Sequence, residues 1–165
     1  MFICLRYHAA HGRSTNIASR QPVGVRMMHI LLVEDDPRMV RFMKRGLEAE
    51  HHTLQFARDL DECLMCLSTT QFDIVIVDVY LRHADGLEIC QAVRHHGGSI
   101  PILLLTAHAT CEAASRCPHP AITDCLAQPF AFDELLEKIS TLVSGALAKS
   151  WAAWNGPDQH TTVTP

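Results

Sequence analysis

The sequence lacks any apolar run near the roughly 20 residues that a membrane-spanning helix requires. It also lacks a glycine-rich phosphate loop, an internal repeat and a low-complexity segment. Residues 1–33 contain no Asp or Glu, while the rest of the chain holds ten basic and eighteen acidic residues, a net charge of about −8. A membrane protein is therefore excluded, and direct nucleic-acid binding is not expected. A chain of 165 residues is long enough for one domain with a good core.

Seven cysteines are many for this length, yet they do not form the pattern of a disulfide framework. Three of them, Cys63, Cys66 and Cys90, fall within helical patterns, where cysteine acts as a small apolar residue. No secretory signal precedes them, so we expect unpaired thiols in a reducing, cytoplasmic compartment. The remaining spacing lacks the paired C-x₂₋₄-C units of structural zinc sites, so no zinc is expected.

The two ends of the chain differ from its middle. Residues 1–27 show no periodicity and precede the first strand pattern directly, so we interpret them as a disordered or mis-assigned extension; a transit peptide is the alternative. Residues 148–165 are predicted to form a short helical extension, through Trp151 and Trp154, and a tail. This segment is too short for a DNA-binding domain.

Between these ends, strand and helix patterns alternate. Short apolar runs predict strands at 29–34, 53–57, 74–77, 100–105 and 122–127. Helices are predicted from Pro37 to His52, after Asp59, after Asp85-Gly86, over 109–116 and over 132–147. Five strands alternating with five helices predict an α/β fold, a doubly wound parallel sheet with helices on both faces.

Oxygen-bearing side chains follow three of the predicted strands. Glu34-Asp35-Asp36 follows the first, Asp78 the third and Thr106 the fourth. The carboxyl ends of parallel strands share one edge of the sheet, where ligands bind in open α/β folds. Carboxylates and a hydroxyl gathered there predict a site for a hard cation such as Mg²⁺. Each acid alone is better explained as a strand-end or helix-cap residue, but the ordered set favours a site.

The same residues carry a resemblance to a known family. The motifs are Leu32-Val33-Glu34-Asp35-Asp36-Pro37, Phe72 to Asp78, Asp85-Gly86, Thr106-Ala107 and Pro129-Phe130, in order and at suitable intervals. Residues 28–147 thereby resemble a receiver domain of bacterial two-component response regulators. The resemblance implies a flavodoxin-like fold whose five strands lie in the order 2-1-3-4-5.

The resemblance also implies roles for individual residues. Asp78 would accept a phosphoryl group, and Mg²⁺ would be held by Glu34, Asp35, Asp78 and the backbone carbonyl of Tyr80. Thr106 and Ala107 would bind the phosphoryl oxygens and report the change. Two positions depart from the family pattern: Gln128 stands where a lysine is usual, and Cys125 where an aromatic residue is usual. A neutral Gln forms weaker hydrogen bonds to phosphate than a charged Lys. We therefore expect Gln128 to weaken the coupling of phosphorylation to conformational change more than phosphorylation itself.

The sequence therefore favours a receiver that is phosphorylated by a histidine kinase or phosphotransfer protein. It is not expected to be an enzyme acting on a separate substrate. Signalling is expected through protein contacts, with a homodimer or an effector on the face of the fourth and fifth helices. The alternatives are a pseudo-receiver that works without phosphorylation and a truncated remnant of a DNA-binding regulator. A flavodoxin-like cofactor binder is a more distant alternative.

Overall fold

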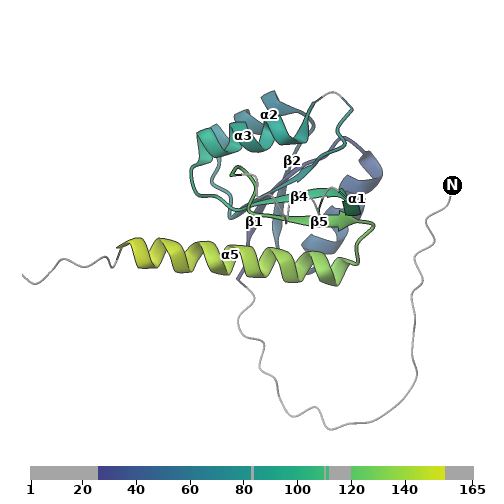
Figure 1. Cartoon of the computed structure of the whole chain (residues 1–165). Coiled ribbons are helices and arrows are strands. Elements are labelled where there is room, and N and C mark those ends of the chain that lie inside the picture. The colour runs from purple at the N-terminus through teal and green to yellow at the C-terminus, as the bar shows by residue number, and fades with distance from the viewer. Residues whose placement is uncertain (1–25, 83, 110, 112–119, 155–165) are drawn as a thin grey trace, which may run out of the picture.

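The computed structural model describes residues 26–82, 84–109, 111 and 120–154. Its centre is one sheet of five parallel strands in the order β2-β1-β3-β4-β5 (Figure 1). The strands are β1 (His29–Val33), β2 (Thr53–Ala57), β3 (Ile74–Asp78), β4 (Ile102–Ala107) and β5 (Asp124–Gln128). The predicted fold class and strand order are confirmed.

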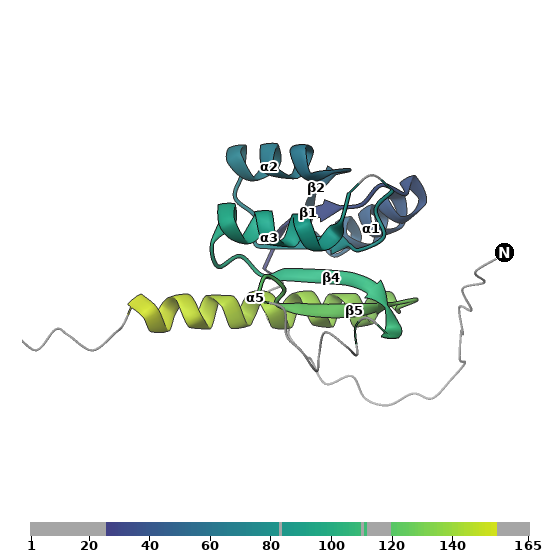
Figure 2. The same ribbon diagram turned by 45° about the horizontal axis from the view of Figure 1, so that its top comes forward.

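Helices cover both faces of the sheet, as the turned view in Figure 2 shows. They are α1 (Pro37–Ala49), α2 (Leu60–Thr69), α3 (Gly86–Gly97) and α5 (Phe132–Trp154). One buried apolar cluster joins α2 and α3 to the sheet, and a second joins α1 and α5 to its other face. Because both faces of the sheet are covered, all five residues of β3 are buried.

Three aspartates begin helices in the way the sequence predicts. The Asp36 side chain accepts a hydrogen bond from the backbone N of Arg38 at 2.8 Å, and Pro37 occupies the first turn. The Asp59 side chain accepts from Glu62 N at 2.9 Å, and that of Asp85 accepts from Leu87 N at 2.9 Å. Each cap follows the carboxyl end of a strand, so the caps direct the chain away from that edge.

Several element boundaries differ from the prediction by one to three residues. Strand β4 runs through Thr106 and Ala107 instead of ending before them, and β5 begins at Asp124 instead of residue 122. The sequence predicts helix through Trp151 and Trp154, and α5 continues through Trp154. The predicted helix over 109–116 lies largely outside the described residues, although residues 108, 109 and 111 are helical.

The expectation of unpaired cysteines is wrong for one pair. A disulfide joins Cys111 to Cys125, with 5.7 Å between the two Cα atoms. The sequence spacing gave no sign of it, because the two residues meet only when β5 pairs with β4. The three cysteines of the helical patterns, Cys63, Cys66 and Cys90, are unpaired as expected.

Candidate functional site

The predicted strand-end oxygens meet at the carboxyl edge of the sheet. Asp78 is the last residue of β3 and is 7% exposed, while Glu34 directly follows β1 and is 3% exposed. Sheet pairing places Val33 beside Val77 and Asp78 beside Leu105. Glu34 and Thr106, each one residue further along, therefore flank Asp78 on its two sides.

Two donors contact the Asp78 carboxylate. The backbone N of Tyr80 donates to Oδ1 at 2.9 Å, and Nε2 of Gln128 lies 3.4 Å from Oδ2. The second distance is at the long limit of a hydrogen bond. Gln128 thus reaches Asp78 from the end of β5, but it brings no positive charge to the site.

Glu34 is a buried carboxyl with one oxygen lacking a hydrogen-bond partner. Its Oε1 accepts from Asp36 N at 2.9 Å, whereas Oε2 has none among the described residues. Burial raises the pKa of Glu34, and the adjoining negative charge of Asp78 raises it further, against the opposing effect of the Asp36 amide. Two adjacent buried carboxyls with an unpartnered oxygen form a place where a cation would relieve repulsion.

Asp35 points toward a different partner. Its Oδ2 accepts a hydrogen bond from the backbone N of Arg82 at 2.8 Å, which ties the β1–α1 connection to the loop after β3. Within the described part of the chain, no three His, Cys, Asp or Glu side chains are arranged so that they could hold a metal ion. Mg²⁺ in proteins keeps several waters and takes only one or two carboxylates, so Glu34 and Asp78 fit such an ion as a pair.

Thr106 contributes a buried hydroxyl without a partner. The residue is 0% exposed, and its Oγ1 makes no hydrogen bond among the described residues. A buried hydroxyl is ordinarily paired, because leaving it unpaired costs about 1–3 kcal/mol. The following residue, Ala107, is half-buried and lies beside Gln128 in the sheet. Thr106 therefore presents a donor at the carboxyl edge that nothing described in the fold uses.

Gly86 lies at the site, although the sequence indicated it only as the start of a helix and as part of a family motif. A Cβ at this position would lie 2.4 Å from the backbone O of Asp78 and 2.8 Å from Cα of Val79. Only glycine lets α3 approach the backbone of Asp78 this closely. The Asp85-Gly86 pair was the available signal, and its packing role becomes visible only in three dimensions.

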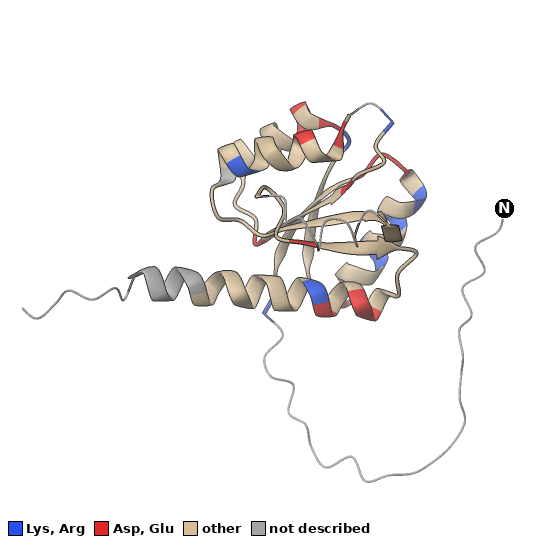
Figure 3. Ribbon diagram, in the orientation of Figure 1, with Lys and Arg blue, Asp and Glu red and all other residues tan. Residues whose placement is uncertain are grey.

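Acidic segments lie at the carboxyl edge, but also on α2, on the start of α5 and at the starts of β3 and β5, and basic segments are likewise spread over several elements (Figure 3). Among the described residues, no helix combines the length and apolar character needed to cross a membrane.

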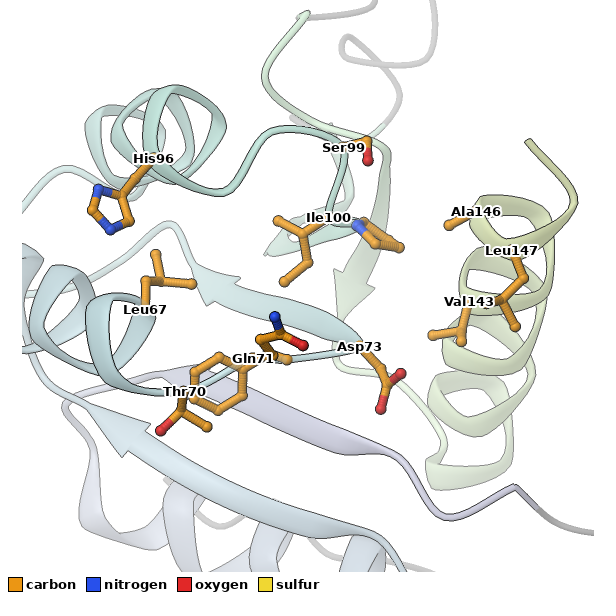
Figure 4. Close-up of a pocket in the computed structure, with 12 residues that line it drawn as sticks. Leu67, Thr70, Gln71, Asp73, His96, Ser99, Ile100, Val143, Ala146 and Leu147 are labelled. Atoms are coloured by element: carbon orange, nitrogen blue, oxygen red, sulfur yellow. The ribbon is translucent and has the colours of Figure 1, made fainter. Parts of the chain in front are cut away.

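A pocket of about 730 Å³ lies at the opposite edge of the sheet (Figure 4). It is lined by residues near the ends of α2 and α3, by α5, and by residues at the starts of β3 and β4, among them Asp73, Ile100 and Val143. None of the strand-end oxygens lines it, so the pocket and the acidic site are separate features.

The family comparison matches residues 30–140 to the response regulator receiver domain. Response regulators named MprA from Mycolicibacterium vanbaalenii and Mycobacterium ulcerans are 32% identical over 116 residues, which is 70% of this chain and 50% of theirs. The chain thus spans about half the length of these curated relatives.

Two solved structures similar to this chain are also a response regulator and a receiver domain. A putative response regulator from Chloroflexus aurantiacus has a TM-score of 0.64 and 27% identity, with 72% of this chain and 98% of that chain covered. The receiver domain of a sensor histidine kinase from Pseudomonas aeruginosa has a TM-score of 0.63 and 25% identity, with the same coverage. The latter structure has a magnesium ion coordinated in its active site cleft.

Proposed function

This chain belongs to the response regulator receiver domain family, and from that premise we propose that Asp78 accepts a phosphoryl group from a histidine kinase or phosphotransfer protein. One observation carries the proposal. The buried, unpartnered hydroxyl of Thr106 lies one residue beyond Leu105, which pairs with Asp78 in the sheet. A phosphoryl group on Asp78 supplies the acceptor that this hydroxyl lacks.

The chemistry follows from the surrounding groups. A carboxylate oxygen of Asp78 attacks phosphorus while the bond from phosphorus to the donor's imidazole nitrogen breaks, giving an acyl phosphate on Asp78. Thr106 Oγ1 donates to one phosphoryl oxygen, and Gln128 Nε2 supplies a neutral hydrogen bond from the other side. The backbone N of Tyr80 holds the carboxylate in position.

The residues that would hold Mg²⁺ are Glu34, Asp35, Asp78 and the backbone carbonyl of Tyr80. Bound there, the ion neutralises charge that develops on the phosphoryl oxygens. The unpartnered Oε2 of Glu34 supports this assignment. Asp35 would contribute the carboxylate oxygen that does not accept from the Arg82 amide.

The proposed domain is the segment 28–147, acting as a signalling module in the cytoplasm without a separate substrate. Its output is contact with a second copy or an effector protein through the face formed by β5, α5 and the segment after β4. We propose no direct contact with nucleic acid.

The test is an intact-mass measurement of the full chain incubated with Mg²⁺ and acetyl phosphate or phosphoramidate. We expect a gain of one phosphoryl group that Asp78→Asn abolishes. The control is Asp61→Asn, an exposed acid on α2, which should leave the gain unchanged. No gain in the unaltered chain, under conditions that load other receivers, would reject phosphorylation.

A pseudo-receiver is the second candidate, and the neutral Gln128 beside Asp78 is the observation that favours it. The two candidates differ in whether phosphorylation of Asp78 changes the rest of the domain. If the mass gain occurs without any change in oligomeric state or in hydrogen exchange at α5, the chain takes phosphate without reporting it. Gln128→Lys should then restore the response, because a charge-assisted bond to phosphate is roughly twice as strong as a neutral one.

A further inference from the structure

The disulfide between Cys111 and Cys125 lies beside the proposed phosphorylation site. Cys125 is the second residue of β5, is 4% exposed and pairs with Leu104 in the sheet. Cys111 is five residues beyond Thr106 and is half-buried. Their Cα atoms are 5.7 Å apart, within the range of about 4.4–6.8 Å at which two cysteines pair without backbone movement.

The bond joins two segments that each adjoin a residue of the proposed site. One is the segment that follows Thr106, and the other is β5, which ends at Gln128. In the family that this chain resembles, the residue at position 125 is usually aromatic. In this chain the same position holds a sulfur covalently fixed to residue 111.

The remaining cysteines of the described residues are poor competitors for oxidation. Burial raises the pKa of the Cys63 and Cys90 thiols to about 12, and also raises that of Cys66. Thiolate is the reactive form, so the raised pKa values make these thiols less reactive at neutral pH. Cys111 is half-buried, so a small oxidant has a route to its sulfur that the fully buried Cys63 and Cys90 lack.

We propose that Cys111 and Cys125 form a reversible redox site that takes a small-molecule disulfide, such as oxidised glutathione, as its oxidant. The Cys111 thiolate attacks the oxidant, forms a mixed disulfide and releases one thiolate. The Cys125 thiolate then attacks the Cys111 sulfur and releases the second. Two thiols lose two protons and two electrons in all, and the oxidant becomes two thiols.

Oxidation fixes the segment after Thr106 to β5, and reduction releases it. In the disulfide-bonded structure Cys125 Sγ lies 3.4 Å from the Cys111 carbonyl oxygen, so a reduced Cys125 thiol would have an acceptor beside it. The consequence for signalling rests on the proposed function: the oxidised chain accepts phosphate but does not pass the change to its output face.

Peptide mapping under non-reducing conditions tests the bond. The full chain is equilibrated in buffers of varied ratio of oxidised to reduced glutathione, alkylated and digested. We expect a linked peptide containing Cys111 and Cys125 in oxidising buffer and its complete loss in reducing buffer without denaturant. Cys111→Ser should abolish the link, and Cys66→Ser, which removes a less reactive thiol, should not. A link that never forms, that joins Cys111 to another cysteine, or that resists reductant in the native protein would overturn the proposal.

Hydrogen exchange tests the consequence and separates it from phosphorylation itself. Amides of 107–111 should exchange at least several-fold faster in the reduced chain, whether or not Asp78 carries phosphate. Adding acetyl phosphate should change hydrogen exchange in β5 and α5 of the reduced chain. It should do the same in the Cys111→Ser variant, in oxidising and in reducing buffer alike. It should cause no such change in the oxidised, unaltered chain. Equal responses in both redox forms would overturn the switch. If the chain takes up no phosphate, the proposed function is rejected. The redox site is then judged from the peptide mapping alone.

Discussion

At the scale of single residues, Gly86 has the least room for change at the site. A methyl group there would collide with the backbone of Asp78 and Val79. We expect Gly86→Ala to displace Asp78 and to slow phosphorylation by acetyl phosphate by roughly ten- to a hundred-fold. The fold should lose about 1–3 kcal/mol of unfolding free energy. Mass spectrometry over time and urea denaturation measure the two effects.

Gly145 provides the matched control. It lies exposed in α5, where an added Cβ would meet no other atom within 4 Å. Gly145→Ala should leave phosphorylation unchanged and stabilise the helix by up to about 1 kcal/mol. If both alanine variants behave alike, contact with the Asp78 backbone is not what constrains position 86.

The same scale shows what the sequence could and could not predict. Asp78, Glu34 and Thr106 were identifiable because a strand-end position follows from an apolar run and one polar residue. The role of Gly86 depends on how α3 approaches β3, and the Cys111–Cys125 bond depends on the pairing of β5 with β4. Such contacts between distant segments leave no periodic pattern in a single sequence.

At the scale of elements, Arg94 connects three of them at the amino edge of the sheet. From α3 its guanidinium donates to the carbonyl oxygens of Gly98, Ile100 and Ala121 at 2.7, 2.8 and 3.1 Å. It also reaches Oγ1 of Thr123 at 3.3 Å, just before β5. These bonds fix the starts of β4 and β5 relative to each other.

Arg94→Met keeps the length of the side chain but removes these donors. We expect a loss of about 2–3 kcal/mol in unfolding free energy, because partly buried carbonyls lose a charged donor. The control is Lys44→Met on α1, whose exposed pair with Glu48 at 3.8 Å should contribute about 0.5 kcal/mol or less. Equal urea midpoints for the two variants would contradict the role of Arg94.

His52 connects the end of α1 to β2 and gives the fold a pH dependence. It is 6% exposed, and its Nδ1 lies 3.4 Å from the backbone N of Met28. Burial lowers the pKa of His52 and the nearby charge of His51 adds to this, while Glu50 and Asp73 oppose it. The folded state therefore disfavours the charged imidazole.

The direction of the pH effect follows. Above about pH 6.5 the histidine is neutral in both the folded and the unfolded chain, and it adds no pH dependence. Below that, the unfolded chain binds a proton that the folded chain resists, so stability falls as the pH falls. His52→Gln should reduce the difference in unfolding free energy between pH 7.5 and 5.5. His95→Gln, at an exposed position on α3, is the control, and an equal reduction there would contradict the assignment to His52.

At the scale of the whole molecule, α5 divides into a packed part and a projecting part. Leu135, Ile139 and Val143 are buried against the sheet, while Leu147 is 47% exposed and the helix continues beyond the body of the domain (Figure 1). The sequence predicts an amphipathic helix over 132–147 and a helical extension through Trp151 and Trp154, and α5 runs through to Trp154. It does not predict that the end of the helix leaves the body of the domain.

A chain ending at Leu147 should therefore keep its stability. We expect its unfolding free energy to stay within about 0.5 kcal/mol of the full chain, because no buried side chain of the described core is removed. A chain ending at Lys138 loses Ile139 and Val143 and should fail to give a cooperative transition. A large loss on removing only residues 148–165 would show that this segment packs on the domain.

The ion pair at the start of the described chain has a practical consequence. Arg26 Nη2 donates to Asp73 Oδ1 at 2.7 Å, and the backbone N of His29 donates to Oδ2 at 2.8 Å. These bonds fix the entry of the described chain into β1 next to Asp73, the residue before β3. The length of β3, about 15 Å, separates this entry point from Asp78. A fluorescent reporter or surface tether joined ahead of Arg26 would therefore stand at the far end of the sheet and leave the carboxyl edge open to the proposed phosphoryl donor.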